Sequence, residues 1–258
     1  MKKVKIIVPI HISKGGGIDL FHEFVHTHIK FHTQCDFILV CQEKEFSCEL
    51  YEILQKEAFE CCFISNAGPN FGVAVGRNIG LSACQEDDYI SFLDYDDKLN
   101  TSYFNFIDNK LLLKSYSLHI FSYSIEYLDV TTLYKPPTLT AVNYLSTHAK
   151  ENFTPCLGTT FKYDGVISFD ENDKVQEDYI FWHLLLKSTE FEKVLFSDIN
   201  SGVYRPRKNS RSSTQRLNIT SRYITYKKMG YGFFSFIYDL VFKMYRGVRK
   251  YGFNIFKL

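Results

Sequence analysis

The stretch Ile90-Ser91-Phe92-Leu93-Asp94-Tyr95-Asp96-Asp97 runs directly from apolar residues into three carboxylates. A short apolar run bounded by polar residues is typical of a buried β-strand. Three carboxylates at the end of such a strand repel one another, and a shared cation relieves that repulsion. Hard divalent cations take oxygen ligands and leave positions open for the oxygens of a diphosphate. The stretch therefore predicts a strand that leads into a divalent-metal site. From these residues alone, an acidic surface turn is the alternative.

Upstream of this stretch, apolar runs alternate with segments of helical spacing. The expected strands are residues 4–10, 37–41, 61–65 and 89–93, and the expected helices are residues 19–31, 46–59 and 73–84. This alternation predicts crossover units and an α/β fold with a mostly parallel sheet flanked by helices. In such sheets, ligands bind beyond the carboxyl ends of the strands. We therefore expect the loops after Ile10, Cys41, Ser65 and Leu93 to line one crevice.

The remaining segments have less regular patterns. Residues 117–128 and 131–140, which include Pro136-Pro137, predict strands and a turn. Residues 158–167 predict another strand, and residues 178–187 a short helix. Residues 13–17 form a glycine-rich loop in this interpretation. The basic, serine-rich residues 205–216 predict a loop or a mobile segment.

Composition narrows the class of protein. A chain of 258 residues suggests one domain with a small appendage, and 30 Lys and Arg against 29 Asp and Glu give no general attraction to nucleic acid. The seven cysteines show no zinc-site spacing, which favours reduced thiols in a cytoplasmic protein, packed as small apolar side chains. No apolar run reaches the length of about 20 residues that spans a bilayer.

The tail has a different character, so we expect one domain at residues 1–220 and a helical segment at residues 221–258. One face of its predicted helix is apolar: Phe233, Ile237, Leu240, Val241, Met244 and Val248. The other face is basic: Lys243, Arg246, Arg249 and Lys250. An apolar face opposite a basic one favours a helix in the interface of an anionic membrane. Packing on the core, or on a second subunit of a homodimer, is the alternative.

Several segments, taken in order, resemble one known family. They are Val8-Pro9-Ile10-His11, the loop from Asn66 to Gly72, Arg77-Asn78-Ile79-Gly80 and Phe92-Leu93-Asp94-Tyr95-Asp96-Asp97. This order and spacing resemble the family 2 glycosyltransferases of the GT-A fold. The later segment Phe169-Asp170-Glu171, followed by Gln176-Glu177-Asp178-Tyr179, is similar to the acidic segment of the same family. The resemblance covers about residues 4–215.

The resemblance implies a nucleotide-sugar site with a bound metal ion. The residues it assigns to the donor are Pro9, His11, Gln42, Glu43, Asn66, Arg77, Asp94, Tyr95, Arg205 and Arg207. The implied Mn²⁺ or Mg²⁺ is held chiefly by Asp96, with Asp97 beside it and Asp94 on either the ribose or the metal. Arg77 either reaches the nucleotide or braces the acidic loop, since its planar fork suits both. Arg205, Arg207 and Arg211 are expected to neutralise the leaving diphosphate.

The chain departs from the family pattern after its second strand. Cys41-Gln42-Glu43-Lys44 stands where the family carries Asp-Asp-Gly-Ser. Gln42 or Glu43 is therefore expected to replace the aspartate that reads the nucleotide base, and the identity of the base stays open. His11 ends the first strand, where the resemblance implies a contact with the nucleotide base.

For catalysis, the resemblance implies that Asp178 is the general base and that Glu177 positions the acceptor or a loop. The residues alone have a simpler interpretation, because acidic side chains in the first turn of a helix interact favourably with its dipole. His183 is expected to be a surface or packing residue.

The resulting expectation is an inverting hexosyltransferase that uses a nucleotide-sugar, in the first instance a UDP-sugar. Its acceptor is a glycan or a lipid-linked molecule in lipopolysaccharide, capsule or other surface polysaccharide synthesis, at the inner face of the plasma membrane. A dehalogenase-type phosphatase is disfavoured by Lys98 at the fifth motif position. A nucleotidyltransferase, suggested by the loop at residues 13–17, and a non-catalytic sugar-nucleotide-binding module are the alternatives. The presence of Asp96 and Asp178 argues against the module.

Overall fold

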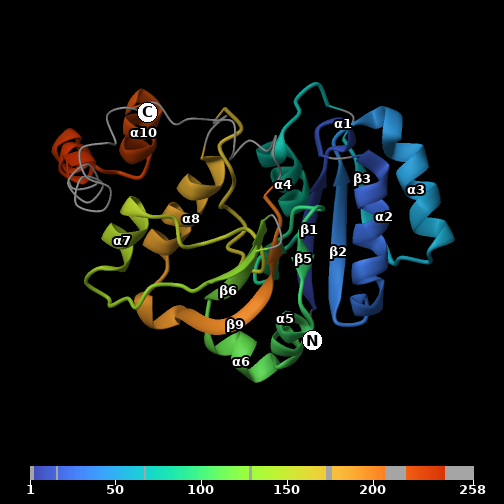
Figure 1. Ribbon diagram of the computed structural model, residues 1–258, viewed down its shortest axis with the longest axis horizontal. Helices are drawn as coiled ribbons and strands as arrows, with labels where there is room; N and C mark the ends of the chain where they lie inside the picture. The colour runs from blue at the N-terminus through green and yellow to red at the C-terminus, as the bar shows by residue number, and fades with distance from the viewer. Residues whose placement is uncertain are drawn as a thin grey trace.

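The computed structural model describes residues 3–15, 17–66, 68–127, 130–172, 176–206 and 219–241. The strands are β1 (Val4–Ile10), β2 (Cys35–Cys41), β3 (Cys61–Ser65), β4 (Tyr89–Phe92), β5 (Lys98–Leu99), β6 (Leu118–Tyr127), β7 (Val130–Tyr134), β8 (Thr160–Lys162) and β9 (Val194–Tyr204). The helices are α1 (Ile12–Gly15), α2 (Gly17–His28), α3 (Ser47–Lys56), α4 (Val73–Ser82), α5 (Thr101–Asp108), α6 (Lys110–Ser115), α7 (Tyr144–Lys150), α8 (Glu177–Ser188) and α10 (Ile219–Lys228) (Figure 1). Short 3₁₀ turns are η1 (Ile29–Phe31), η2 (Lys44–Phe46) and η3 (Phe191–Lys193), and residues 233–241 are also helical.

In the described residues, the strands form one nine-stranded sheet in the order β3-β2-β1-β4-β8-β6-β9-β5, with β7 paired to β6. The strands β1 to β4 are mutually parallel. Because β8 is antiparallel to both β4 and β6, β6 points the same way as the first four strands, and β9 is parallel to β6. Only β5, β7 and β8 run the other way. This arrangement confirms an α/β fold with a mostly parallel sheet.

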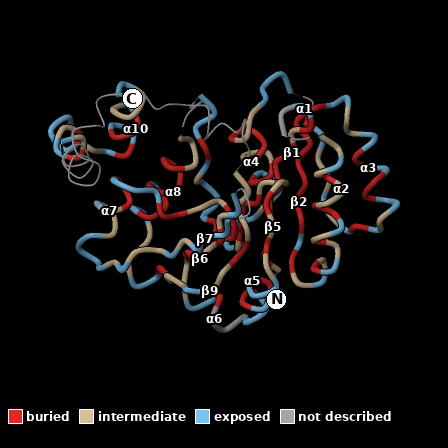
Figure 2. The backbone as a smooth tube through the Cα atoms, viewed as in Figure 1, coloured by how far each residue is buried: buried red, intermediate tan, exposed pale blue. Residues whose placement is uncertain are grey.

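The sheet lies between two helical layers because successive side chains of a strand point to opposite faces. Ile6 of β1 belongs to a buried cluster with side chains from α2, α3 and α5. The next residue, Ile7, belongs to a second cluster with side chains from α4 and α8. Figure 2 shows buried residues along β1 and β2 and exposed ones on the outer side of α3.

Helix α4 approaches β1 closely through two glycines four residues apart. A Cβ on Gly80 would overlap the side chain of Ile7, and a Cβ on Gly76 would overlap the amide of Gln42 and approach Pro9. Only glycine leaves room for this contact. The close approach brings the residue between them, Arg77, to the carboxyl ends of the strands.

The first four strands and the three helices between them are confirmed, with ends shifted by a few residues. The expected loop at residues 13–17 is wrong in part, because residues 12–15 form the short helix α1. Helices α5 and α6 and strand β9 were not predicted from the sequence. Strand β9 carries polar residues on both faces and pairs with β6 through register shifts, so it has no clean alternation of apolar residues. The expected domain boundary at residue 220 lies inside α10.

The cysteines differ in their surroundings. All seven lie in the described residues and form no disulfide bond there, and Cys35 and Cys41 are buried as expected. Cys48 and Cys62 are exposed, so the expectation of small apolar core residues is wrong for these two.

A buried histidine pair joins α7 to α8. Nδ1 of His148 lies 3.2 Å from Nδ1 of His183, and the other ring nitrogen of His148 lies 2.6 Å from the hydroxyl of Thr154. Burial lowers the pKa of His148 to about 3 and that of His183 to about 4. Burial also lowers the pKa of His28, the last residue of α2, to about 4. All three rings are therefore neutral near pH 7, and His183 is a packing residue.

We predict that acidification from pH 7 to pH 5 lowers the free energy of unfolding. The unfolded chain takes up protons on these histidines near pH 6.5, whereas the folded chain does not until about pH 4. Below pH 6, each histidine contributes a loss of roughly 1 kcal/mol per pH unit. Urea unfolding at pH 7, 6 and 5 measures this loss.

The matched variants are His183→Gln, which should remove one histidine's share of the pH dependence, and His26→Gln at an exposed ring, which should leave it unchanged. A free energy of unfolding that stays constant or rises between pH 7 and pH 5 would contradict the prediction.

Candidate active site

The carboxyl ends of β1, β2, β3 and β4 meet at one edge of the sheet. Backbone hydrogen bonds hold the chain segments that leave these strands side by side. The N–H of Gln42 donates to Ile10 O at 2.9 Å, and the N–H of Asn66 donates to Cys41 O at 2.8 Å. The N–H of Leu93 donates to Ile7 O at 3.0 Å. The sequence-predicted loops are thus neighbours, as the rule for parallel sheets requires.

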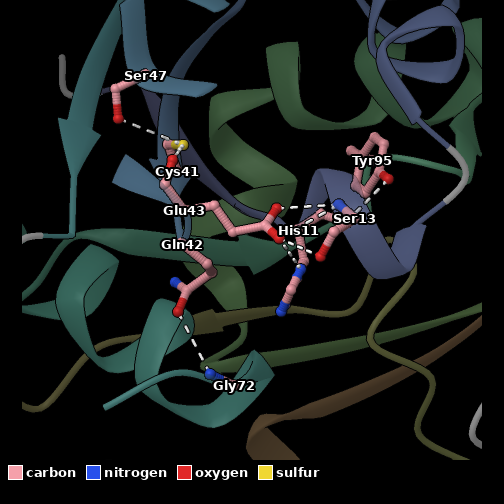
Figure 3. A network of polar contacts seen from close by, with 8 residues as sticks. All are labelled: His11, Ser13, Cys41, Gln42, Glu43, Ser47, Gly72 and Tyr95. Atoms are coloured by element: carbon pink, nitrogen blue, oxygen red, sulfur yellow. Dashed lines mark hydrogen bonds and ion pairs between the residues drawn. The ribbon is translucent and has the colours of Figure 1, made fainter. Parts of the chain in front are cut away.

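A polar network closes the loops after β1 and β2 (Figure 3). The carboxylate of Glu43 accepts hydrogen bonds from the N–H and the hydroxyl of Ser13, and lies 3.1 Å from Nδ1 of His11. Burial raises the pKa of Glu43, but the bonds from Ser13 and the nearby His11 outweigh it and hold the pKa below its usual range. Tyr95 donates its hydroxyl hydrogen to His11 O at 3.2 Å. Glu43, His11 and Tyr95 therefore shape the loop together.

Gln42 and Asn66 are the buried amides at this edge. Gln42 is 1% exposed, and its side-chain oxygen accepts the N–H of Gly72 at 3.4 Å. Asn66 accepts the N–H of Gly68 and donates to Asn70 O, both at 2.9 Å. The two amides thus hold the loop between β3 and α4 from both of its ends.

Arg77 is the buried centre of the site. Its guanidinium donates to Asp94 Oδ1 at 3.0 Å and lies 5.3 Å from the centre of the Phe169 ring. Burial by itself lowers the pKa of Arg77, but acidic neighbours outweigh it and raise the pKa overall. These neighbours are Cys156, Asp94, Asp178 and Glu177. The arginine therefore stays charged, and it links the acidic loop after β4 to the acidic pair that opens α8.

The residue after Arg77 has a separate structural task. The side-chain amide of Asn78 donates to Phe169 O at 3.0 Å and accepts the N–H of Phe169 at 2.8 Å. It also donates to the carboxylate of Glu171 at 2.9 Å. Asn78 thus ties α4 to the segment that precedes Glu177 and Asp178. Sequence reasoning quoted Asn78 in a motif but assigned it no contact.

The three carboxylates after β4 point to different partners. Asp94 faces Arg77, while buried Asp97 accepts the N–H of Arg205 at 3.1 Å. Asp96 is half-buried between them. Within the described residues, the one set of three ligand-type side chains whose atoms lie within 4.8 Å of one another is instead His22, His26 and Glu57. The acidic loop is therefore not a closed cage.

An open arrangement of this kind still fits a divalent cation. Mg²⁺ is usually held by one or two carboxylates, with substrate phosphates and waters completing its coordination. Asp96, with Asp94 nearby on the same loop, offers that donor set. The residues present thus fit a metal that binds together with a diphosphate.

Glu177 and Asp178 lie in the first turn of α8. The preceding residue, Gln176, adopts the left-handed region at φ 64°, which a residue with a side chain rarely occupies. Asp178 is half-buried and lines a cavity of about 230 Å³. Burial raises its pKa, and the charge of Arg77 opposes part of that rise. A carboxyl group of raised pKa beside a cavity is suited to accept a proton.

Arg205 already has carboxylate partners in this structure. Its guanidinium contacts Glu23 at 3.0 Å and Glu126 at 3.2 Å, and these partners outweigh burial and raise its pKa. Binding of a diphosphate by Arg205 therefore requires an exchange of partners. Arg207 and Arg211 lie outside the described residues.

Cys156 is a member of the site that sequence reasoning missed. It neighbours Arg77, Asp94, Asp178 and the indole of Trp182, and burial raises the pKa of its thiol. No local signal marks it, because a single cysteine in an irregular segment has no recognisable spacing.

Comparison with known proteins gives matches at the level of structure. No family model matches the sequence, and no curated protein matches it. A Staphylococcus aureus TarS structure in complex with UDP-GlcNAc superposes with a TM-score of 0.65 at 15% identity, covering 88% of this chain and 65% of that one. Other TarS chains are covered over 37% to 64% of their length, so this chain spans less than two thirds of them.

Two further structures are similar. Glucosyl-3-phosphoglycerate synthase from Mycobacterium tuberculosis has a TM-score of 0.58 at 12% identity, with 90% of this chain and 81% of that one covered. A mannosyltransferase from Pyrobaculum calidifontis has a TM-score of 0.53 at 11% identity, with 81% and 58% covered. At these identities the likeness is one of fold, and this chain has the GT-A fold that these glycosyltransferases share.

Proposed function

We propose that this chain is a metal-dependent, inverting glycosyltransferase of the hexosyltransferase type. Its donor is a nucleotide-sugar, in the first instance a UDP-sugar, and its acceptor is a hydroxyl group of a glycan or a lipid-linked molecule. The observation that carries this proposal is the contact of buried Arg77 with Asp94 on one side and its proximity to Asp178 on the other. A single charged residue thereby connects a candidate donor site to a candidate base.

The similar solved structures agree with this choice of substrate. TarS was solved with UDP-GlcNAc, and the Mycobacterium tuberculosis enzyme with Mn²⁺, UDP-glucose and phosphoglyceric acid. The mannosyltransferase holds GDP-mannose and Mn²⁺. A UDP-sugar and a divalent ion are therefore the first ligands to test.

In the proposed reaction, the acceptor oxygen attacks the anomeric carbon as the bond from that carbon to the diphosphate breaks. Asp178 takes the proton of the attacking hydroxyl, and attack opposite the leaving group inverts the anomeric centre. Arg77 stays charged and orients Asp94 towards the donor. Asp96, with Asp94 on the same loop, would hold a divalent ion, which would supply Lewis-acid stabilisation of the negative charge on the leaving diphosphate.

We place the reaction in surface-polysaccharide synthesis, such as lipopolysaccharide or capsule, at the inner face of the plasma membrane. None of the helices in the described ranges is long and apolar enough to cross a bilayer. The helical residues 233–241 bury Phe236 against Tyr223 and Tyr226 of α10. The same stretch exposes Phe233, Phe234, Tyr238 and Val241. These apolar side chains are the surface proposed to meet lipid, while the basic face predicted beyond residue 241 lies outside the described residues.

We predict that one nucleotide-sugar among UDP-, GDP-, CMP- and dTDP-sugars is bound and slowly hydrolysed with Mn²⁺ and not with EDTA. Asp96→Ala should abolish metal-dependent binding of that donor. Asp178→Asn should keep donor binding and lower the rate of transfer by roughly 100- to 10,000-fold, as expected for loss of a general base. Calorimetry and a release assay for the nucleoside diphosphate measure the two effects.

Asp198→Asn, on an exposed carboxylate of β9, is the matched control and should leave binding and turnover unchanged. Absence of binding for every donor would favour a non-catalytic module. Equal turnover by the Asp178→Asn variant and the wild type would remove Asp178 from the mechanism.

We predict that Phe234→Glu weakens binding to vesicles that contain anionic lipid by roughly 10- to 150-fold, because an aromatic side chain that no longer enters the lipid costs about 1.5–3 kcal/mol. Val142→Glu, at a position that is 94% exposed on another part of the surface, is the control and should sediment like the wild type. Unchanged sedimentation of Phe234→Glu, together with loss of a dimer in analytical ultracentrifugation, would assign this surface to a second subunit.

A further inference from the structure

A cavity of about 230 Å³ is lined in part by Asp178. Its walls come from α7, α8 and α10, which lie together at the end of the molecule away from α2 and α3 (Figure 1). The residues that line it include Lys150, Gln176, Asp178, Tyr179, Arg222 and Tyr226. Asp178 also lies near Arg77 and Asp94. The candidate base therefore borders this cavity and also lies near the Arg77–Asp94 pair.

Two cationic side chains line the cavity. The guanidinium of Arg222 donates a hydrogen bond at 3.2 Å to Asp239, which is 1% exposed. That bond uses one of the five N–H donors of the arginine. Lys150, at the exposed end of α7, adds a second positive charge. A planar guanidinium with an ammonium group beside it is suited to bind phosphate or carboxylate.

The cavity also presents groups for hydroxyls. The side-chain oxygen of Gln176 is buried and has no hydrogen-bond partner among the described residues. A buried acceptor without a partner costs free energy that a ligand hydroxyl would recover. Tyr179, which also lines the cavity, donates its hydroxyl hydrogen to His148 O at 2.6 Å and so ties α8 to α7 at this wall.

We propose that this cavity is the acceptor site and that it selects a hydroxylated acceptor carrying a phosphate or carboxylate group. The acceptor's anionic group lies at Arg222 and Lys150, and its hydroxyls face Gln176 and Asp178. This inference rests on the proposed glycosyl transfer and adds to it the chemical class of the acceptor.

The experiment measures binding of glucose 6-phosphate and of glucose to the full chain by calorimetry, with and without UDP. The wild type should bind the sugar phosphate at least tenfold more tightly than the sugar, and UDP should not displace it. Lys150→Gln should weaken binding of the sugar phosphate by roughly tenfold, the effect of losing one charge-assisted contact. Arg222→Lys keeps a positive charge opposite Asp239, so this variant should fold. It should lose less affinity for the sugar phosphate than Lys150→Gln does.

The matched control is Lys227→Gln, which removes an exposed lysine of α10 that does not line the cavity and should change nothing. Equal affinity for the sugar and its phosphate, equal losses in the Lys150 and Lys227 variants, or displacement by UDP would each overturn the inference. If the wild type hydrolyses a donor and any one of these contradicting results is found, the proposed glycosyl transfer is retained and the proposed class of acceptor is rejected. If no donor binds but the sugar phosphate does, the cavity is a sugar-phosphate site and its assignment to an acceptor is overturned.

Discussion

The buried guanidinium of Arg77 is the interaction on which the candidate site depends. A buried charge is costly unless it is paired, and removing one member of a buried pair costs about 3–5 kcal/mol. The Asp94 carboxylate is 39% exposed, so solvent screens this pair and its value lies below that range. The acidic groups around Arg77 outweigh the effect of burial on its pKa. The positive charge of Arg77 thus interacts favourably with both acidic segments, the loop after β4 and the pair that opens α8.

The position of Arg77 follows from the packing of α4. The glycines on either side of it let the helix lie against β1, and Asn78 fastens the same helix to Phe169. These neighbouring residues of one motif therefore serve three contacts: sheet packing, charge pairing and anchoring of the segment before α8. Their common result is that Asp178 lines the cavity and at the same time lies near Arg77 and Asp94.

The cavity beyond Asp178 depends on polar groups buried in the second helical layer. The pair of His148 and His183 joins α7 to α8, and Asp239 holds Arg222 of α10 in place. Buried polar groups that are satisfied in this way favour one arrangement of the helices over others. The same helical stretch that supplies Asp239 exposes Phe234 and Tyr238 on its other side. Acceptor binding and contact with lipid are therefore proposed for neighbouring surfaces of one layer.

Local patterns in the sequence were enough to predict several features of the molecule. Residues 4–10 and 90–97 predicted strands that end in polar loops, and the order of motifs predicted a GT-A fold and residues such as Asp96 and Asp178. The pairing of these groups depends on the packing of the folded chain: Arg205 pairs with Glu23, Glu43 with Ser13, and Asp97 with the backbone of Arg205. That packing also decides the presence of Cys156 in the site and the shape of the cavity. The reason is that local spacing sets the direction of a side chain along one element, whereas partners distant in the chain are set by how the layers pack.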